Sequence, residues 1–403
     1  MDKKIGKEAS KLLFGDLIYI LTSVFINTFL VSYLLQVTND NITKVATYYI
    51  TVHIIRFIGA LVIGRSIKRY PNICKQVLSL SAIIRAFFIL LIVALNKNMV
   101  YYYIFVAGVY AVSEVLYWGT HELMYISLTN NSNRSNFITI KKVLGQAINI
   151  VVPAILGASI ELVSFNKIAV YVFILSILQI GATLSIKNSQ ILRDNKKYSM
   201  AEFRAKIKKE KLVDITRFAR ASVFYGAFEK TASKIIIVIT MMTFKTSMSL
   251  GILTTVFALC SMIAIMIYNK LDKRRSNKHI FIILAILIIL SVIGLLLNIN
   301  KTTLIIYNLC YMIGLGIYDV VYNIKKGNIV VDNKIEKYKE EYVAYVTAAI
   351  SMGRIIGYIL MLIAGILNDL IFFKLLLILI TVAIPLFTGS LLKLEKYTEE
   401  RRK

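Results

Sequence analysis

Two carboxylates stand inside long apolar runs of this sequence, and each is followed by a tyrosine three residues later. Glu114 opens the motif "EVLY" and Asp319 opens "DVVY", and the two acids lie about half of the 403-residue chain apart. A charged side chain at the centre of a lipid bilayer costs about 2.5–3.5 kcal/mol. Such residues therefore tend to pair or to line a watery cavity. A buried carboxylate is also a natural proton site, because burial disfavours its charged form.

Further ionisable residues in the apolar runs offer partners for these acids. Two more acids are Asp16 and Glu229. The bases, which suit counter-charges or contacts to an anionic substrate, are Arg56, Arg85, Lys230, Lys234 and Arg354. Lys230 and Lys234 share one face of a helix because they are four residues apart. These two like charges need a counter-charge, and the candidates are Glu114, Asp319 and an anionic substrate.

The acids have two interpretations each, and the sequence leaves both open. Glu114 and Asp319 are either proton sites in a cavity or halves of ion pairs that hold helices together. Arg85 and Arg354 are the expected partners in such pairs. Asp16 is either a cavity residue or a residue at the level of the lipid headgroups.

Aromatic side chains gather around both motifs. They are Tyr110, Tyr117, Trp118, Tyr318 and Tyr322. Such rings fit the wall of a substrate cavity, and they fit the membrane interface equally well, where Tyr and Trp are enriched. Glu122 lies beside His121 at the inner end of the fourth predicted span, and we expect Glu122 at the interface.

The residues needed for several kinds of catalysis are missing from the sequence. An ATP-binding loop needs the pattern Gly-x-x-x-x-Gly-Lys-Ser/Thr, and none of the Lys-Thr pairs has a Gly before the Lys. The chain has three histidines and three cysteines, without the spacing of a metal site. We therefore expect no enzyme activity, no metal and no cofactor.

The elements that must position these residues are long apolar helices. The chain is 58% hydrophobic with a mean hydropathy of +0.70, and its apolar runs reach the roughly 20 residues that cross a bilayer. Because unpaired backbone groups are not tolerated in lipid, we predict an all-α polytopic membrane protein with twelve transmembrane helices. Their ranges are 12–36, 46–64, 76–95, 99–124, 139–161, 168–186, 216–241, 248–268, 279–298, 302–324, 342–366 and 370–392.

Basic residues alternate with the predicted helices in a way that indicates their orientation. When the N-terminus is placed in the cytoplasm, most Lys and Arg fall in inside segments. The outside loops carry only Lys44, Lys97, Lys167, Lys245 and Lys301. This asymmetry follows the positive-inside rule and predicts cytoplasmic N- and C-termini. The net charge of +26 is therefore expected to face anionic lipid headgroups rather than a nucleic acid.

The two halves of the chain resemble each other. The longest hydrophilic stretch, 187–215, separates a six-helix bundle at 1–186 from a second at 216–392, and a cytoplasmic tail follows at 393–403. The motifs "EVLY" and "DVVY" and the glycines of spans five and eleven recur at a nearly constant spacing, which indicates a 6+6 duplication. Within the separating stretch, "SMAEFRAKIKKEKL" fits either a basic amphipathic helix on the membrane surface or a charged linker.

With twelve spans, a central basic loop and short basic loops after spans two and eight, the chain resembles the major facilitator superfamily. The first short loop is a degenerate copy of that family's gate motif and keeps Gly64, Lys68 and Arg69, and the second keeps Asp272 and Arg274. The resemblance implies that spans one, four, seven and ten line a central cavity, and each of these spans carries one of the four acids. It also implies that Asp272 ties its loop to an opposite helix at the inner gate.

These features together predict a secondary active transporter. We expect a monomer that exports a small molecule, coupled to protons that the buried acids carry. The abundance of Ile, Lys, Asn and Tyr favours a bacterial source, and so a multi-pass protein of the bacterial cytoplasmic membrane. Two alternatives stay open. One is a flippase of the same fold for a lipid-linked substrate, and the other is a membrane sensor or immunity protein that transports nothing.

Overall fold

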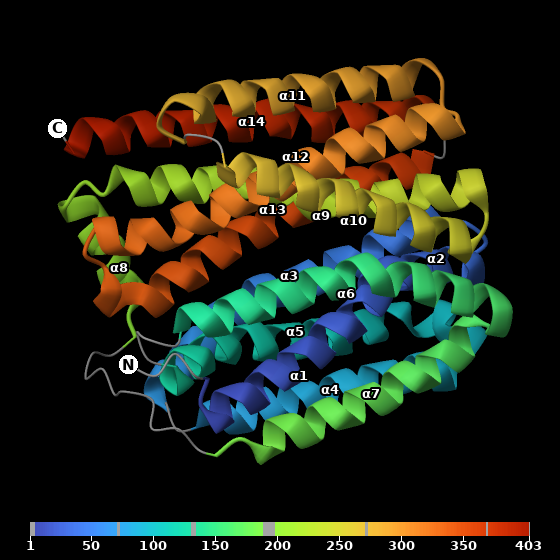
Figure 1. The fold of residues 1–403 in the computed structure, drawn as a ribbon, viewed down its shortest axis with the longest axis horizontal. Helices are drawn as coiled ribbons and strands as arrows, with labels where there is room; N and C mark the ends of the chain where they lie inside the picture. Colours follow the sequence, from blue (N-terminus) through green and yellow to red (C-terminus); the bar gives the residue numbers. More distant parts are fainter. Residues whose placement is uncertain are drawn as a thin grey trace. The chain divides into compact units, whose positions relative to one another are not determined.

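The computed structural model describes residues 5–70, 73–129, 134–187, 198–270, 273–367 and 370–402. Throughout these ranges the chain is helical, with short turns between helices (Figure 1). Among the described residues, ten segments are long and apolar enough to cross a membrane, judged by length and composition. The all-α prediction is therefore confirmed for this part of the chain.

The first half of the chain forms helices that match the first six predicted stretches. They are α1 (Lys7–Val24), η1 (Phe25–Phe29), α2 (Leu30–Val37), α3 (Ile42–Arg69), α4 (Cys74–Leu95), η3 (Asn96–Asn98), α5 (Met99–Leu128), α6 (Arg134–Val163) and α7 (Phe165–Ser185). The first predicted stretch runs through α1, the single π-helical turn η1 and α2 without a break. The short 3-10 turn η3 joins α4 to α5.

The second half contains helices that match the other six stretches, together with one short helix. They are α8 (Met200–Lys209), α9 (Val213–Phe244), α10 (Ser247–Lys270), α11 (Lys273–Leu297), α12 (Lys301–Asp332), η4 (Glu336–Tyr338), α13 (Lys339–Leu367) and α14 (Leu370–Arg402). The ten membrane-length segments differ from the twelve predicted ones for two reasons. The segment Cys74–His121 takes in both α4 and α5, and α9 carries charges in its central turns. The exact number of spans stays a prediction.

The expected gate loops are helical where the structure describes them. Gly64, Lys68 and Arg69 lie in the last turns of α3, which ends at Arg69 rather than at 64. The helix continues because these residues include no proline to interrupt it. In the second copy, Arg274 lies in the first turn of α11, and Asp272 lies outside the described residues.

Contacts divide the chain into two compact units, which we call unit 1 and unit 2. Unit 1 comprises Met1–Asp40, Ile58–Tyr198 and Thr246–Thr255, and unit 2 comprises Asn41–Phe57, Ser199–Lys245 and Val256–Lys403. The first part of α3 therefore groups with the second half of the chain, and the start of α10 groups with the first half. The predicted boundaries of the two six-helix bundles stay a prediction.

Within unit 1, α4 packs against both α5 and α7, and α1 packs against α6 and α7. The side chains buried among these helices are mostly aliphatic and aromatic, as Phe25, Phe88 and Phe137 illustrate. Polar groups from α1, α4, α5 and α6 meet within this packing and form the first part of the site described below.

Within unit 2, α9 packs against α12, α13 and α14. Glycines allow the backbones of α9 and α13 to approach closely. A Cβ atom on Gly226 would collide with the carbonyl oxygen of Ile350, and one on Gly353 would collide with that of Val223. Small residues permit such close crossings between membrane helices. The crossing brings the polar residues that follow these glycines side by side.

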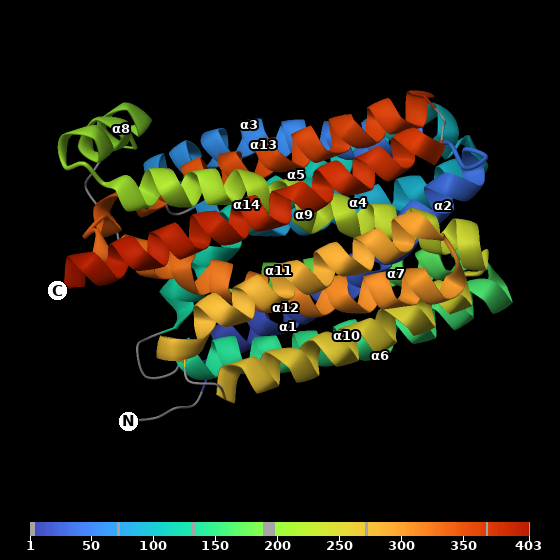
Figure 2. The ribbon, with the colours of Figure 1, turned by 90° about the horizontal axis from the view of Figure 1, so that it is seen from above.

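The stretch between the two halves forms a short basic helix, α8, which packs on the start of α13 (Figure 2). The side chain of Ser199 caps α8 by accepting a hydrogen bond from the Glu202 backbone at 3.2 Å. Phe203 is fully buried against the rings of Tyr338 and Tyr345. The helical interpretation of this stretch is therefore confirmed, and its contact with a membrane surface stays a prediction.

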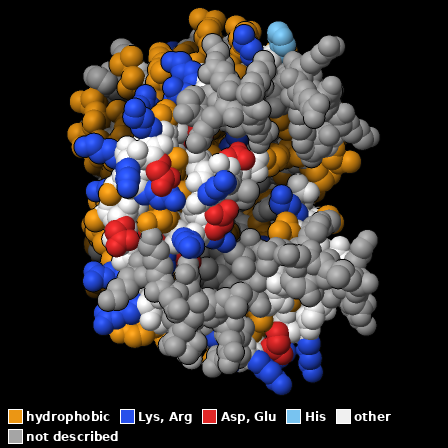
Figure 3. All heavy atoms as spheres, turned by 90° about the vertical axis from the view of Figure 1, so that its left-hand side faces the viewer, with side chains coloured by type: hydrophobic (Ala, Val, Ile, Leu, Met, Phe, Trp, Pro, Cys, Tyr) orange, Lys and Arg blue, Asp and Glu red, His pale blue; other side chains and the backbone are white. Residues whose placement is uncertain are grey.

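Basic side chains gather at the end of the molecule where α8 lies. Figure 3 shows Lys and Arg over the described part of this face, with fewer acidic groups between them. Helix α8 contributes Arg204, Lys206, Lys208 and Lys209. A basic end suits the predicted cytoplasmic side because cytoplasmic segments are rich in Lys and Arg. The sidedness itself stays a prediction.

Candidate functional site

A buried polar network in unit 1 begins on α1. Asp16, Tyr19 and Thr22 are spaced three residues apart and therefore lie along one side of the helix. Their exposed fractions are 1%, 5% and 0%, respectively. Because buried polar groups need partners inside the protein, these side chains bind groups from α4, α5 and α6.

Arg85 of α4 is held from several directions and is 1% exposed. Its Nη1 donates to Glu114 Oε1 at 3.0 Å, its Nε donates to Thr22 Oγ1 at 2.9 Å, and its Nη2 donates to Ser23 Oγ at 2.7 Å. The guanidinium also lies over the Tyr19 ring, 4.2 Å from the ring centroid, which adds a cation–π contact. The Tyr19 hydroxyl donates to the same Glu114 oxygen. Glu114 therefore forms the expected ion pair with Arg85.

The second acid of unit 1, Asp16, is shared by three side chains. The Tyr117 hydroxyl donates to Asp16 Oδ1 at 2.7 Å. The other carboxylate oxygen, Oδ2, lies 2.7 Å from His121 Nε2 and 2.9 Å from Lys141 Nζ. Lys141 Nζ also lies 2.8 Å from His121 Nε2. His121 is 4% exposed, and its ring is bound to the buried Asp16 carboxylate.

Stacked tyrosines connect these two acids. The rings of Tyr19 and Tyr117 lie parallel with centroids 3.5 Å apart. The hydroxyl of Tyr19 donates to Glu114 and the hydroxyl of Tyr117 donates to Asp16. A shift of one ring would therefore displace the ring stacked on it and disturb the hydrogen bonds of both carboxylates. The edge of Trp118 meets both rings, at 5.8 and 5.3 Å.

Unit 2 repeats this arrangement with different chemistry. The hydroxyl of Tyr225 on α9 donates to Asp319 Oδ1 at 2.8 Å, as Tyr19 does to Glu114. The ring of Tyr225 stacks on Tyr322 at 4.4 Å, and the Tyr322 hydroxyl lies 2.8 Å from Ser222 Oγ. In the repeat, Ser222 of α9 corresponds to Asp16 of α1, and Asp319 of α12 corresponds to Glu114 of α5. The number of residues between the two positions is the same in both units to within one. The duplication seen in the sequence therefore extends to the contacts.

The two equivalent acids nevertheless have different surroundings. Glu114 is 5% exposed and bound to a guanidinium, whereas Asp319 is exposed and bound to Tyr225 and to the amide of Asn323 at 3.0 Å. The expected pair between Asp319 and Arg354 is therefore not formed.

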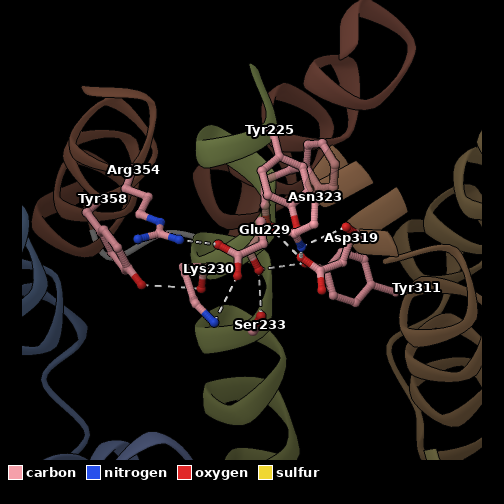
Figure 4. A network of polar contacts seen from close by, with 10 residues as sticks. Tyr225, Glu229, Lys230, Ser233, Tyr311, Asp319, Asn323, Arg354 and Tyr358 are labelled. Atoms are coloured by element: carbon pink, nitrogen blue, oxygen red, sulfur yellow. Dashed lines mark hydrogen bonds and ion pairs between the residues drawn. The ribbon is translucent and has the colours of Figure 1, made fainter. Parts of the chain in front are cut away.

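The ion pairs of unit 2 centre on Glu229 of α9 (Figure 4). Arg354 of α13 donates through Nη2 to Glu229 Oε2 at 2.8 Å, and Lys230 Nζ lies 2.8 Å from Glu229 Oε1. Lys230 therefore pairs with its own neighbour on α9, which is not among the counter-charges considered in the sequence analysis; an anionic substrate as counter-charge stays a prediction. The Tyr311 hydroxyl and Ser233 Oγ both donate to the Glu229 backbone carbonyl, at 2.9 and 2.6 Å.

A group of rings adjoins these charges. Tyr358 of α13 stacks on Tyr49 and on His53, both of α3, with centroids 5.1 and 5.4 Å away. The Tyr358 hydroxyl donates to the Lys230 carbonyl at 3.2 Å. Lys234 is 4% exposed, and its Nζ lies 5.2 Å above the Tyr49 ring.

The predicted aromatic residues fall into three groups. Tyr117 and Tyr322 belong to the stacked pairs. Tyr110 packs against Phe88, and Tyr318 is fully buried, so these two serve the apolar core. Trp118 is 46% exposed.

Sequence reasoning missed several side chains that complete the network. They are Tyr19, Tyr49, His53, Lys141, Tyr225 and Tyr358. One signal was available for two of them: Tyr19 and Tyr225 are separated by nearly the same number of residues as the two acids that they bind, Glu114 and Asp319. Arg56 is half-buried on α3. Among the described residues, no group of three or more His, Cys, Asp or Glu suits a metal ion.

Comparison with known proteins shows the fold. No protein-family model and no curated protein sequence matches this chain. Two crystal structures of the nucleoside transporter NupG, one of them of a mutant, match with TM-scores of 0.74 and 0.71 at 11% and 13% identity; each covers 96–97% of this chain and 100% of the other. A bacterial homologue of the iron transporter ferroportin, in an inward-facing state, matches with a TM-score of 0.67 at 13% identity and covers 96% of this chain and 98% of the other.

Proposed function

The chain has the fold of the major facilitator transporters, and from this premise we propose that it is a proton-coupled secondary transporter. In this proposal a monomer in the bacterial cytoplasmic membrane exports a small molecule by alternating access. The similar structures are of transporters whose names give a nucleoside and iron as cargo, and at such low identity neither cargo carries over to this chain.

The observation that carries the proposal is the buried group Asp16–His121–Lys141. Histidine is the side chain whose charge changes most readily between pH 5 and 8. Here its Nε2 faces both a carboxylate oxygen at 2.7 Å and an ammonium nitrogen at 2.8 Å. A ring nitrogen with a hydrogen donates to the carboxylate and repels the ammonium, whereas one without a hydrogen accepts from the ammonium. One proton therefore decides which partner His121 keeps.

The contacts of Asp16 offer a route from this proton to the rest of unit 1. Tyr117 donates to Asp16 and stacks on Tyr19, which donates to Glu114 beside Arg85. A change in the position of Asp16 would therefore alter contacts among helices α1, α4, α5 and α6. We assign the proton site to Asp16 with His121, and we assign Glu114 the role of holding Arg85.

The test is transport by the purified protein in liposomes that contain a pH-sensitive dye. We expect an imposed pH gradient to drive movement of at least one compound from a panel of nucleosides, organic anions and organic cations. His121→Asn should abolish gradient-driven transport and keep counterflow exchange, because the substrate site is intact. His279→Asn is the matched control, since His279 is exposed on α11, and it should keep both activities.

Three outcomes would overturn the proposal. Gradient-driven transport that survives in both His121→Asn and Asp16→Asn would show that Asp16 and His121 are not the proton site. Movement of labelled lipids alone would favour the flippase. Absence of movement for every compound would favour a sensor.

A further inference from the structure

Helix α8 is fastened to the protein through its apolar side. Phe203, its largest apolar side chain, is fully buried, with ring centroids 5.9 and 6.2 Å from those of Tyr338 and Tyr345. At the start of α8, the backbone N–H of Ser199 donates to Oε1 of the buried Glu341 at 3.0 Å. An interfacial helix is usually held to a membrane by burying its apolar face among the lipids. In α8 that role is excluded for Phe203, because its ring is already packed against protein.

The opposite side of α8 is exposed and basic. Arg204 and Lys208 share one face of the helix because they are four residues apart, and Lys209 follows about 100° further round. All three side chains are exposed, and we call them the basic face of α8. The exposed acid Glu202 lies in the first turn, about two turns before Lys209. The other acid, Glu210, lies beyond the last helical residue and pairs with Lys206 on the protein-facing side.

The contacts of α8 lie where an apolar span begins. Tyr338 and Tyr345 flank the start of the predicted span 342–366. The apolar run of a membrane helix ends at the level of the lipid headgroups, and Tyr is enriched at that level. Helix α8 contacts α13 there, at the end of unit 2 where α9 begins (Figure 2). Its exposed side chains therefore lie at the level of the headgroups.

We propose that the basic face of α8 binds the anionic headgroups of the lipid leaflet at this end of unit 2. Exposed Lys and Arg are attracted to anionic lipids, and each one near the surface strengthens binding about fivefold. The contact is electrostatic and needs no insertion of α8 into the lipid, because the apolar side of the helix is occupied by α13.

This arrangement differs from both interpretations of the sequence, which were a helix that lies on the membrane by its apolar face and a charged linker. Here the helix is bound by protein on one side and by lipid on the other. The inference does not depend on the proposed transport function, since the contact needs neither a substrate nor a proton gradient.

The experiment measures how fast a cysteine on α8 is modified in liposomes. The three native cysteines are replaced by alanine in the full-length chain, and Ala205→Cys places a thiol on the exposed side of α8, beside Arg204. N-ethylmaleimide is the reagent, because it is uncharged and crosses the membrane. We expect labelling to be about fivefold slower or more in liposomes that contain phosphatidylglycerol than in liposomes of phosphatidylcholine alone. Asn328→Cys, on an exposed position near the end of α12, is the control and should react at similar rates in both.

Salt separates electrostatic binding from insertion. At 1 M salt the Debye length falls to about 3 Å, so the protection of the cysteine at position 205 should disappear. A helix that inserts its apolar side would stay protected at high salt, and it would be protected in phosphatidylcholine as well.

Charge variants locate the contact. The triple variant Arg204→Gln, Lys208→Gln and Lys209→Gln should lose the protection, and it leaves Phe203 and the Ser199–Glu341 hydrogen bond in place. A matched variant removes the same number of charges from exposed positions in other parts of the chain, by Lys97→Gln, Lys167→Gln and Lys245→Gln, and should keep the protection.

Three results would overturn the inference. They are equal labelling at position 205 in both kinds of liposome, protection that persists at 1 M salt, and protection that persists in the triple variant of the basic face. The labelling uses no gradient and no transported compound, so its outcome is independent of the transport assay.

Discussion

Replacing Glu114 by glutamine removes the only carboxylate that the structure places against the Arg85 guanidinium among the described residues. Arg85 is 1% exposed and keeps the hydroxyls of Thr22 and Ser23, which satisfy hydrogen bonds without neutralising the charge. Removing one partner of a buried ion pair costs about 3–5 kcal/mol. We expect a loss of this size in the free energy of unfolding for Glu114→Gln.

A double-mutant cycle separates the ion pair from the other contacts. Arg85→Met should also destabilise, because it removes the cation that pairs with the buried Glu114 carboxylate. The double variant removes both charges, so its loss should fall short of the sum of the single losses by about 2 kcal/mol, within the range for residues in contact. Stability is measured by equilibrium unfolding in mixed micelles.

The cycle needs a control and has a clear refuting result. Glu210 pairs with Lys206 on α8 at 3.7 Å and is 48% exposed, so Glu210→Gln should cost less than about 1 kcal/mol. Additive losses for Glu114→Gln and Arg85→Met would mean that the two side chains do not interact, and the account of unit 1 would then be wrong.

Two other predictions follow from the packing. Gly353→Ala should destabilise the protein because its Cβ would collide with the Val223 carbonyl oxygen. The control Gly389→Ala should not, because there is open space around its new methyl group. Equal midpoints of thermal unfolding for the two variants would contradict the close crossing of α9 and α13. Trp118 is the only tryptophan of the chain and lies edge-on to the His121 ring at 6.1 Å, so its emission spectrum should differ between the wild type and His121→Asn at the same pH. Identical spectra of the two proteins would contradict this ring contact.

Much of the fold was predictable because lipid leaves the backbone few choices. Continuous apolar runs of membrane length must form helices, and every predicted run coincides with a helix among the described residues. The ends of helices were less predictable. Helix α3 continues through Arg69 because polar residues such as Lys68 are compatible with a helix once it leaves the apolar region.

The sequence predicted which residues would form the candidate site, but it did not predict most of the pairs that their side chains form. The Glu114–Arg85 pair was among the expected ones. The pairing of Lys230 with its own neighbour was not expected, because helix geometry places Cβ atoms and says little about the ends of long side chains. Tyr49 and His53 were missed because residues of α3 join the rings of α13 through packing between distant segments, which one sequence does not record.

The π-helical turn η1 has a mechanical consequence for the first span. A π turn holds one residue more than an α turn, so it offsets the rotational phase of everything that follows it by about 100°. The buried contacts of Asp16 and Tyr19 fix which side of α1 faces the interior. The orientation of α2 is fixed by buried residues such as Leu34 and by Tyr33, whose ring stacks on Phe165 with centroids 4.0 Å apart. The extra residue of η1 therefore allows α1 and α2 to bury two separately oriented sets of side chains within one continuous span.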